Sequence, residues 1–572
     1  MGINLKHIIM KKILMMFCAS AILASCAGIL DDDKTPVNNG EIEKSYIAIN
    51  LMAADPDTRA DDPTYQEGSE AERKVNSAYF FFFQNGQPFP VTVTEGAVTA
   101  PGTSGANFLS ATLTGNASNM PNVSDVKDVV LLLRNYKGQY PNQIVAVLNW
   151  VPEANKSYTM DDLKAVVDIQ STATDSQKYF VMSNAVYADG GGQAVTATPL
   201  TLANIYTSES DAKTHPVDIY VERVAAKVTV TAPAAQKFDL NKTVNVGGTA
   251  VKAYAEVTGW ELYNEFDQSY LLKNIDPKWT VDAVGFNWND QSFFRSYWAT
   301  SPAPAWTSES NAFTWKGGLG FGLSANVTAG TYTENTFVYC GENTTATAAD
   351  RTKVILKAKL VDETGNALEL ARWHGAEYLS ESDLLTAVAS TLKNTYYSGV
   401  TVGETTTYTS IDPTDLQCVV GGGTDAPAGV NATEVYFQLS TAGAGRDWFE
   451  YSSKYGYTAV TDEALNTALK AVPSGILYND GQTYYFFDIK HLGAAGKPAE
   501  YGIVRNHIYS ININSIGGFG SPVYAPDTKI ETPQYPDEPT DQGSYVSAKV
   551  NILSWRMVSQ GVDIQPQPTP GN

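Results

Sequence analysis

The sequence predicts an all-β protein that contains a few short helices. Aromatic residues make up 11% of the 572 residues, led by 32 Tyr, and such residues favour the pleated, half-buried surface of a sheet. Only 17% of the residues are charged, against about 25% in a typical soluble globular protein. Apolar and polar residues alternate with a period of two in many short segments. Turn residues separate these segments, and the chain has 45 Gly and 27 Pro.

The composition also excludes several classes of protein. The chain has 39 Lys and Arg against 61 Asp and Glu, so its formal net charge is −22. An acidic surface repels phosphate backbones, and we therefore expect no nucleic acid among the partners. Intrinsic disorder requires few aromatic and apolar residues, whereas this chain is rich in both. Its length is sufficient for about two to four domains.

The N-terminus has the pattern of a bacterial export signal. Lys11 and Lys12 precede a mostly apolar run, residues 13–24, which is too short to span a bilayer. The run ends at Leu23-Ala24-Ser25-Cys26, which resembles a lipobox. In such signals the Cys is diacylated and becomes the first residue of the mature protein, so we predict lipidation at Cys26. The alternative is that this Cys is simply a small apolar residue at the end of the signal.

The segment after the signal and the other cysteines indicate less about the function of the protein. Residues 27–44 are rich in Asp, Asn and Gly and have the composition of a flexible tether. Outside the signal only Cys340 and Cys418 remain, and an oxidising compartment would permit a disulfide between them. The sequence alone does not pair them, and two buried free thiols are the other interpretation.

Strand patterns recur along the first half of the chain. The expected strands are residues 78–83, 129–133, 144–148 and 217–230. Asn85-Gly86, directly after the first of these, is a hairpin signal. The last of them has a bend or bulge expected at Ala225-Ala226, and Pro233 ends its pattern. We therefore place a domain boundary near Pro233.

The second half repeats this style with two helices added. The expected strands are residues 337–339, 354–360, 435–439, 484–489 and 508–513. Residues 383–392 carry apolar side chains at helical spacing, with Ser380 or Ser382 as the N-cap. Residues 462–472 have the same spacing, with Thr461 or Asp462 as the N-cap. We expect both helices to be insertions packed on sheets.

The C-terminal end differs from the rest. Residues 522–539 form an acidic segment punctuated by Pro, and a strand follows at residues 545–555. One face of this strand carries Val546, Ala548, Val550 and Ile552. A strand that is isolated behind such a linker cannot bury its apolar face locally. It needs a sheet to join, either in its own chain or in another.

A search for catalytic or metal-binding motifs finds little. The five His residues form no pair at helical spacing, and the glycine clusters complete no nucleotide-binding pattern. Trp373-His374 is the most enzyme-like dipeptide, but a lone His beside a Trp is more often a packed ring. The many Tyr residues could stack on sugars, although sheets favour Tyr in any case. We expect no enzyme activity, no catalytic residue, no cofactor and no metal.

Several segments together carry a resemblance to a known family. They are the lipobox at Cys26, the strand at residues 46–51 followed by Thr58-Arg59-Ala60, and residues 221–228, 269–272, 506–511 and 545–555. In this order and spacing they resemble the major fimbrillins of Bacteroidales type V pili, most closely the shaft subunit of the short (minor) fimbriae. The resemblance spans nearly the whole chain.

The resemblance implies a fold and a domain organisation. The fold would be two tandem β-sandwich domains of transthyretin-like topology with short helical insertions and an extended C-terminal donor strand. The implied parts are a lipoprotein signal peptide at residues 1–26, a propeptide with a tether and a removable first strand at 27–59, an N-terminal domain at 60–234, a C-terminal domain at 235–526 and a donor-strand arm at 527–572.

The resemblance also implies how the protein would work. A maturation protease would cleave between Arg59 and Ala60, because members of the family are cut by an arginine-specific protease after their first strand. The cut removes a strand whose Ile47, Ile49 and Leu51 would face a core. The C-terminal strand of another copy, with Val546, Ala548, Val550 and Ile552, would then fill the open groove. Such donation is head-to-tail, so it propagates as an open filament.

The implied protein is therefore a structural subunit of a cell-surface fimbrium that supports adhesion and biofilm formation. Its partners would be other copies of itself, anchor and tip subunits, and the protease. Before maturation a lipid would anchor the precursor to the outer membrane of a Gram-negative bacterium. The alternatives are a tip or accessory fimbrial adhesin, and a monomeric surface lipoprotein that binds glycan or a host protein.

Overall fold

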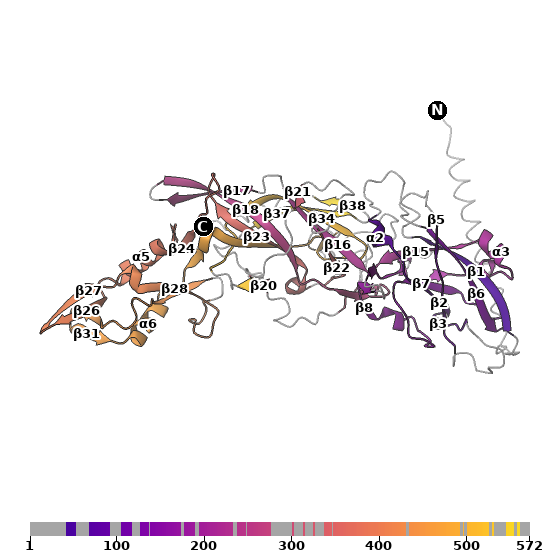
Figure 1. The fold of residues 1–572 in the computed structure, drawn as a ribbon, viewed down its shortest axis with the longest axis horizontal. Helices are drawn as coiled ribbons and strands as arrows, with labels where there is room; N and C mark the ends of the chain where they lie inside the picture. Colours follow the sequence, from indigo (N-terminus) through magenta and orange to yellow (C-terminus); the bar gives the residue numbers. More distant parts are fainter. Residues whose placement is uncertain are drawn as a thin grey trace, which may run out of the picture.

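The computed structural model describes most of the chain. The described residues are 42–52, 68–91, 105–116, 126–136, 138–172, 177–188, 194–232, 237–246, 249–275, 300–302, 313–314, 324–325, 337–345, 347–430, 434–491, 496, 500–524, 529–530, 545–553 and 557–560. They form three units that follow one another along an elongated molecule (Figure 1). The all-β prediction is confirmed, since strands dominate all three units.

The N-terminal unit is built from one ten-stranded sheet. Its main path runs β3-β2-β7-β11-β15-β1-β6-β5, and β4 and β14 pair with β2 and β7 beside this path. The strands are β1 (Ile42–Met52), β2 (Ala78–Gln84), β3 (Gln87–Pro88), β4 (Phe108–Ser110), β5 (Thr114–Asn116), β6 (Val126–Tyr136), β7 (Gln143–Leu148), β11 (Met182–Asn184), β14 (Thr198–Pro199) and β15 (Val217–Arg223).

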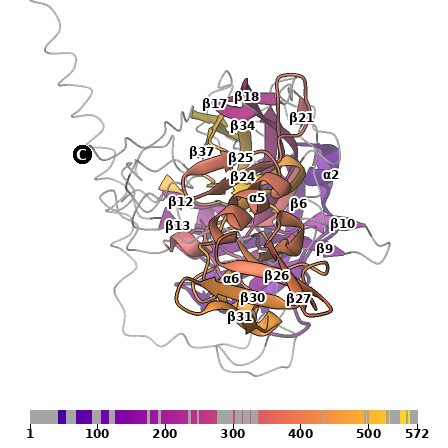
Figure 2. The same cartoon turned by 90° about the vertical axis from the view of Figure 1, so that its left-hand side faces the viewer.

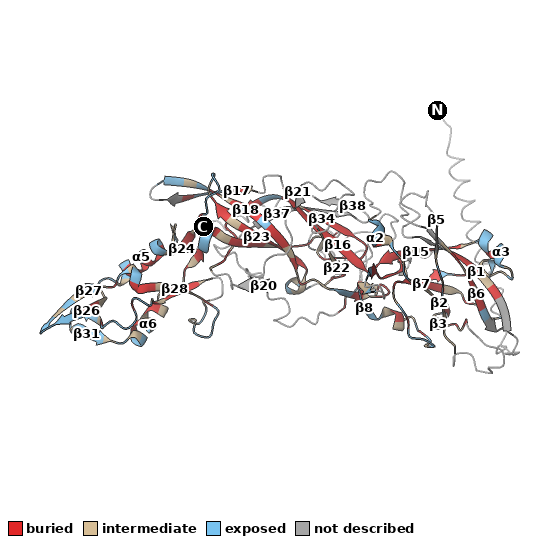
Figure 3. Cartoon of the chain, in the orientation of Figure 1, coloured by how far each residue is buried: buried red, intermediate tan, exposed pale blue. Residues whose placement is uncertain are grey.

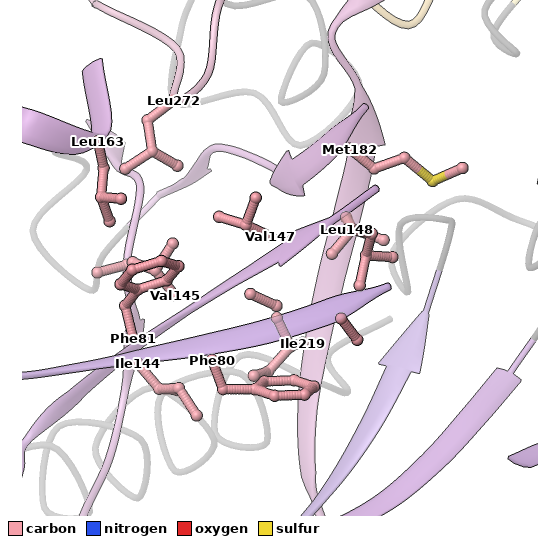
Figure 4. Packing of buried hydrophobic residues seen from close by; sticks show 14 of the residues in the cluster. Phe80, Phe81, Ile144, Val145, Val147, Leu148, Leu163, Met182, Ile219 and Leu272 are labelled. Atoms are coloured by element: carbon pink, nitrogen blue, oxygen red, sulfur yellow. The ribbon is translucent and has the colours of Figure 1, made fainter. Parts of the chain in front are cut away.

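Strand β15 joins two layers of this sheet. Its first half, Val217 to Tyr220, pairs with β1, and its second half, Val221 to Arg223, pairs with β11. One strand that serves two layers turns the sheet back on itself, as at the corner of a sandwich. The apolar side chains between the layers form the first core, which Figure 4 shows around Phe80, Phe81 and Ile219.

Short elements surround this core. They are α2 (Glu70–Arg73), α3 (Glu209–Thr214), the 3-10 turns at Asp162–Lys164 and Leu202–Asn204, and the small strands β8 (Val166–Asp168), β9 (Gln170–Thr172), β10 (Lys178–Phe180), β12 (Tyr187–Ala188) and β13 (Ala194–Val195). Helix α3 lies beside β1 and β6 at the end of the molecule (Figure 1).

The middle unit packs two sheets around a second core. One sheet has β21 (Ser324–Ala325), β16 (Ala225–Ala232), β34 (Ile508–Gly517), β37 (Tyr545–Leu553) and β38 (Met557–Gln560) in this order, and β22 (Phe337–Gly341) also pairs with β16. The other has β17 (Lys237–Val246), β18 (Thr249–Tyr263), β23 (Lys353–Val361), β33 (Gln482–Asp488) and β35 (Ser521–Pro522). Buried side chains of both sheets meet in one cluster, which includes Val228, Trp260 and Ile511.

The third unit is a set of small sheets with two helices around a separate core. Its strands are β24 (Leu370–Trp373), β25 (Ala376–Tyr378), β26 (Tyr396–Val402), β27 (Thr405–Ser410), β28 (Leu416–Val420), β29 (Val435–Leu439), β30 (Trp448–Ser452), β31 (Gly456–Val460) and β32 (Ile476–Tyr478), and its helices are α5 (Glu381–Leu392) and α6 (Asp462–Lys470). Figure 2 looks onto this unit. Trp448 lies fully inside its core.

Burial differs between the units. Figure 3 shows buried residues along the strands of the first two units, whereas the outer ends of β26, β27 and β31 are exposed. Val402 is 77% exposed and Tyr455 is 71% exposed at these outer ends. The third unit therefore ends in hairpins that have no cover within the described part of the chain.

Local predictions from the sequence are confirmed at the turns and caps. Asn85 and Gly86 take positive φ angles of 50° and 78° between β2 and β3, as a tight hairpin requires. The Ser380 hydroxyl accepts the Asp383 amide at the start of α5, and the Thr461 hydroxyl accepts the Ala464 amide at the start of α6.

The long-range organisation differs from the expectation in three respects. The chain leaves the N-terminal sheet at Val224, between β15 and β16, and thus before Pro233. The expected single C-terminal domain has two separate cores. The described part of the expected C-terminal arm is not extended away from the molecule but pairs with β34 as β37. These differences have one cause. Contacts between residues far apart in sequence decide which strands pair, and local sequence patterns do not record such contacts.

Candidate functional site

Strand β1 fills a slot in the middle of the N-terminal sheet. It pairs antiparallel with β6 along its whole length, from Ile42 opposite Tyr136 to Met52 opposite Val126. On its other side, Ile49 to Met52 pair in parallel with Val217 to Tyr220 of β15. Both neighbours therefore use β1 to satisfy backbone groups, and loss of β1 would leave two strand edges open.

The inner face of β1 belongs to the first core. Ile47 and Ile49 are fully buried among the side chains of β2, β7 and β15. Leu51, the third predicted member of this face, also belongs to β1, and its partner in β6 is Lys127. The predicted first strand is thus present, and it lies inside its sheet with a strand on each side.

The outer face of β1 meets a different environment. Ala48 on this face is only 4% exposed. At the edge of β1 that β15 shares, the backbones of Tyr46 and Tyr206 exchange two hydrogen bonds of 2.7 and 2.9 Å. A hollow of about 790 Å³, called here the α3 hollow, lies next to Ala48, and Asp128, Glu209 and Lys213 also line it. Residues of β4, β6 and α3 line the hollow together with Ala48 and Ile49 of β1.

Strand β37, the predicted donor, lies near the edge of its sheet, whereas β1 lies inside its own. It pairs antiparallel with β34, with Tyr509 opposite Ile552 and Ile511 opposite Val550. Among the described residues, the sheet continues beyond β37 with β38, which is the second strand of the same hairpin. The β37–β38 hairpin is therefore an edge of the middle unit, and its departure would open one strand edge of the rest of the sheet.

Three of the segments that carry the family resemblance meet where the first two units join. The Lys227 amide donates to the His507 carbonyl at 2.9 Å, and the Asn506 amide donates to the Ala225 carbonyl at 2.7 Å. Arg505 is fully buried, and its guanidinium donates to the carbonyls of Leu271 and Tyr270. Residues 221–228, 269–272 and 506–511 thus form one joint.

A buried ion pair fixes the chain just after the first strand to this joint. Glu72 of α2 is 1% exposed, and its carboxylate accepts Lys227 Nζ at 2.7 Å and the Tyr339 hydroxyl. Arg223 Nε donates to the Glu72 carbonyl at 2.7 Å. Ser69 and Glu72 also form a capping box. Residues 69–72 are therefore held independently of β1.

The protonation of this pair follows from its surroundings. Burial acts to raise the pKa of Glu72, but the Lys227 ammonium and the hydrogen bonds from Lys227 and Tyr339 outweigh it and lower that pKa. Burial lowers the pKa of Lys227, which the Glu72 carboxylate opposes. We conclude that Glu72 is ionised and that the pair holds two opposite charges out of water.

Some of the predicted site residues lie within the described part of the chain, and others do not. Cys26, Arg59 and Ala60 lie outside the described residues. The disulfide considered between Cys340 and Cys418 does not form. Both thiols are free and buried, and they belong to the cores of different units. Burial raises the pKa of both thiols, so neither is a reactive thiolate.

Sequence reasoning missed several residues that shape these sites. It did not single out Glu72, Arg505 or the members of the α3 hollow. The one available signal was Ser69-x-x-Glu72, a capping-box pattern. Buried charges are otherwise indistinguishable from surface charges in a sequence, because only their spatial partners make burial tolerable.

Metal-binding clusters and membrane-spanning helices are both absent from the described residues. Within them there is no cluster of His, Cys, Asp and Glu that could hold a metal ion. None of the helices in the described ranges is both long and apolar enough to cross a bilayer. His374 follows Trp373 in a turn with a φ of 50°, and its ring packs edge-on against Trp373.

Comparison with known proteins assigns part of the chain. Residues 476–561 match the family model described as major fimbrial subunit protein type IV, fimbrillin, C-terminal. The matched region contains both β34 and β37. The predicted resemblance to fimbrillins is thereby confirmed. No curated protein sequence matches the chain.

Solved structures give more distant likenesses. A proposed cell adhesion protein from Parabacteroides distasonis is 14% identical, with 91% of this chain and 98% of that chain covered and a TM-score of 0.33. A fimbrilin from Porphyromonas gingivalis W83 is 12% identical, with 90% and 98% covered and a TM-score of 0.34. A proposed cell adhesion protein from Bacteroides eggerthii is 12% identical, with 91% and 98% covered and a TM-score of 0.30.

Proposed function

We propose that this chain, which carries the C-terminal region of a fimbrillin, is a structural shaft subunit of a cell-surface fimbrium and not an enzyme. The precursor is exported by a Gram-negative bacterium as an outer-membrane lipoprotein that is lipidated at Cys26. A maturation protease cuts between Arg59 and Ala60 and releases the first strand. The subunits then polymerise head-to-tail by donor-strand exchange, together with anchor and tip subunits, in filaments that support adhesion.

The observation that carries this proposal is the position of β1 in the sheet. Ile47 and Ile49 are fully buried, and β1 pairs with a strand on each side. Burial of each such side chain stabilises by about 1.5–3 kcal/mol, and each ladder hydrogen bond adds about 1 kcal/mol. A subunit without β1 therefore has a strong drive to bind a strand from elsewhere.

Strand β37 suits the role of that replacement. Its residues Val546, Ala548, Val550 and Ile552 share one face of the strand, as Ile47, Ile49 and Leu51 share one face of β1. It is held at one edge of the middle unit. Release of an edge hairpin costs less than loss of a central strand, so transfer of β37 into the open slot of another copy is favoured.

The charge of the mature chain fits a soluble polymer. Residues 1–59 contain six basic and seven acidic residues, so the remainder has 33 basic and 54 acidic residues and a net charge of −21. Repulsion between such subunits opposes lateral clumping of filaments. The acidic excess therefore belongs to the shaft and not to the discarded segment.

Blocking the cut tests the proposal directly. We expect Arg59→Ala precursor to remain monomeric in cells, whereas wild-type chains give ladders that survive SDS without heating. The readout is an immunoblot of unheated and heated samples, with electron microscopy of the cell surface. Equally abundant ladders from Arg59→Ala would refute cleavage at this bond as the trigger.

A reversible lock tests the role of β37. Ser510 and Asn551 are opposite each other in the β34–β37 ladder, and Ser510 is not among the residues of the second core. A disulfide in the Ser510→Cys, Asn551→Cys variant ties the strand to its own subunit. The oxidised, cleaved variant should stay monomeric and should polymerise after reduction, while the Ser510→Cys single variant polymerises throughout. Polymer formation by the oxidised double variant would exclude β37 as the donor.

A further inference from the structure

One face of the four-stranded sheet in the third unit carries a cluster of aromatic rings. This sheet has the order β27-β26-β30-β31 and lies at the end of the molecule (Figure 1). Alternation along β30 sends Trp448 into the core of the third unit and Phe449 to the opposite face. The rings on that opposite face, called here the aromatic face, come from all four strands and are Tyr397, Tyr408, Phe449, Tyr451 and Tyr457. None of the five belongs to the core of this unit, so burial there does not account for them.

The rings of the aromatic face hold one another in place. Tyr408 and Tyr457 stack with their centroids 3.7 Å apart and 4° between their planes, although two strands lie between them in the sheet. The Phe449 ring lies over Gly399, where an added methyl group would be 2.5 Å from a ring carbon. The other ring contacts within the face are edge-on or tilted, with centroids 4.9–6.2 Å apart. Because these contacts already order the rings, binding on this face would immobilise few side chains.

The aromatic face is open to solvent and rich in hydroxyl groups. Tyr451 is 41% exposed and Tyr457 is 39% exposed. Partial burial raises the pKa of Tyr457, and the other three Tyr hydroxyls of the face raise it further because they lie close to it. The remaining residues of the four strands on this face are small or carry a hydroxyl, namely Gly399, Thr401, Thr406, Ser410 and Ala459.

The strands contribute no charge to the aromatic face. Glu450 is the only charged residue in the sequences of the four strands, and it lies on the opposite face as the partner of Tyr396. Other charges of this region, such as Glu404, Asp447 and Lys454, lie between the strands. The whole chain has a net charge of −22. An anionic ligand would therefore be repelled by the chain, and the strands of the aromatic face offer no ion pair to any ion.

We propose that the aromatic face binds a neutral saccharide chain. A pyranose ring has faces of C–H groups, whose partial positive charge is attracted to the negative face of an aromatic ring. Its hydroxyls can exchange hydrogen bonds with Tyr, Ser and Thr hydroxyls at the same time. A face that combines rings, hydroxyls and absence of charge provides both kinds of contact. A folded protein would bring a polar rim with charged groups, which this face does not complement.

This binding does not depend on strand exchange. The four strands lie in the third unit, which contains neither β1 nor β37, so precursor and mature chains should bind alike. Failure of filament assembly would overturn the proposed function and leave the saccharide site intact. If the chain polymerises as proposed, each subunit presents one aromatic face, and weak contacts with a glycan-covered surface add up through avidity.

A glycan array tests the class of ligand. Labelled monomeric precursor is applied to neutral glycans built from hexoses and N-acetylhexosamines, and to sialylated and sulfated glycans. We expect binding to neutral glycans and weaker or no binding to acidic ones. Binding to none of the neutral glycans, or to acidic glycans alone, would overturn the proposal. Capture of a protein through the same Tyr residues, without glycan binding, would replace the saccharide by a protein partner and would also overturn it.

Substitutions on the two faces of the same sheet locate the site. The Tyr451→Ala, Tyr457→Ala variant removes two exposed rings and should weaken binding by about tenfold. The Tyr451→Phe, Tyr457→Phe variant keeps the rings and should lose less. The matched control is Val400→Ala, Val402→Ala, which removes more exposed apolar side chains from the opposite face and should leave binding unchanged. Equal affinity of the wild type and the Ala variant, equal losses from the Ala and Phe variants, or a loss from the Val control would each contradict the site.

Tyrosine nitration provides a readout that needs no substitution. Mass spectrometry of the precursor, nitrated with and without the best-binding neutral glycan of the array, measures the modification of each tyrosine. Bound glycan should protect Tyr451 and Tyr457, while the tyrosines of the first two units keep their reactivity. Unchanged nitration of Tyr451 and Tyr457 at saturating glycan would place the binding elsewhere and overturn the proposal.

Discussion

Strands β1 and β37 have similar sequences and opposite positions. Both place apolar residues at every second position of one face, yet β1 lies between two partners and β37 lies in an edge hairpin. The side chains of Ile47 and Ile49 complete a core, so the N-terminal unit depends on having some strand in that slot. The middle unit already has a sandwich of its own without β37. The difference is that β1 has a strand partner on each side, whereas β37 lies in an edge hairpin, which is the arrangement that the proposed strand exchange requires.

The strongest test of this comparison sets a chain that lacks both strands against a chain that lacks only β37. A chain that starts at Ala60 and lacks residues 545–572 has an empty slot and no donor. We expect its N-terminal unit to lose about 3–6 kcal/mol from the two isoleucines alone, with further loss from unpaired ladder groups. Hydrogen exchange of β6 and β15 amides should rise sharply.

The matched control is the precursor that lacks only residues 545–572. It keeps β1, and its β6 and β15 amides should be as protected as in the full chain. Its own losses should be confined to β34, the strand that β37 covers. Equal protection of β6 with and without β1 would show that the slot does not depend on a strand, and the comparison would fail.

The joint between the two units should carry the next largest effect. Lys227 is buried against Glu72 and lies over the Phe337 ring at 4.0 Å. Lys227→Met leaves the Glu72 carboxylate buried without its partner, which typically costs about 3–5 kcal/mol. The measurement is urea unfolding of the precursor, with separate probes in the first and middle units.

An exposed ion pair provides the control for this substitution. Lys252 pairs with Asp239 at 3.2 Å on the surface of the β17–β18 hairpin, with more than half of the Lys252 side chain exposed. Lys252→Met should change the stability by about 0–1 kcal/mol. Because Glu72 and Lys227 hold the segment that precedes β2, we expect the loss from Lys227→Met in mature chains as well as in the precursor. A loss confined to the precursor would show that the joint depends on β1.

The sequence was sufficient for those features that local patterns encode. Alternation and Asn85-Gly86 predicted the β2–β3 hairpin, and the polar residues Ser380 and Thr461 predicted the starts of α5 and α6. The resemblance, and not the alternation, indicated which strand would be removed. Its prediction that β1 faces a core is consistent with the burial of Ile47 and Ile49.

Features that depend on distant partners could not be predicted. Residues 217–230 form one continuous strand pattern, but β15 and β16 join different sheets, and the switch at Val224 leaves no local signal beyond the bend expected at Ala225-Ala226. The α3 hollow arises because a short helix lies beside an Ala in a strand far away in sequence. Alternation likewise predicts that β37 needs a sheet but does not choose among sheets.

The smallest predicted effect concerns pH and the loop that crosses the joint. Glu265 is partly buried, and burial, together with the nearby Glu261 and Asp267 carboxylates, raises its pKa to about 7. Its unfolded value is about 4.5. Between these values the folded chain holds a proton that the unfolded chain has released, so stability falls as pH rises through this window and levels off above it.

Glu265→Gln should remove this slope, because the amide does not titrate. The measurement is the urea midpoint at about pH 5 and about pH 7.5, with Glu256→Gln, an exposed position on β18, as the control that keeps the slope. The neighbours of Glu265 in the chain bond to both units, since the Phe266 carbonyl accepts from Gly341 and the Asp267 carbonyl accepts from Ile169. None of these contacts involves β1, so the slope should be identical before and after cleavage. A slope present only in the precursor would mean that the first strand and the joint are coupled, and that β1 cannot leave without loosening the connection between the units.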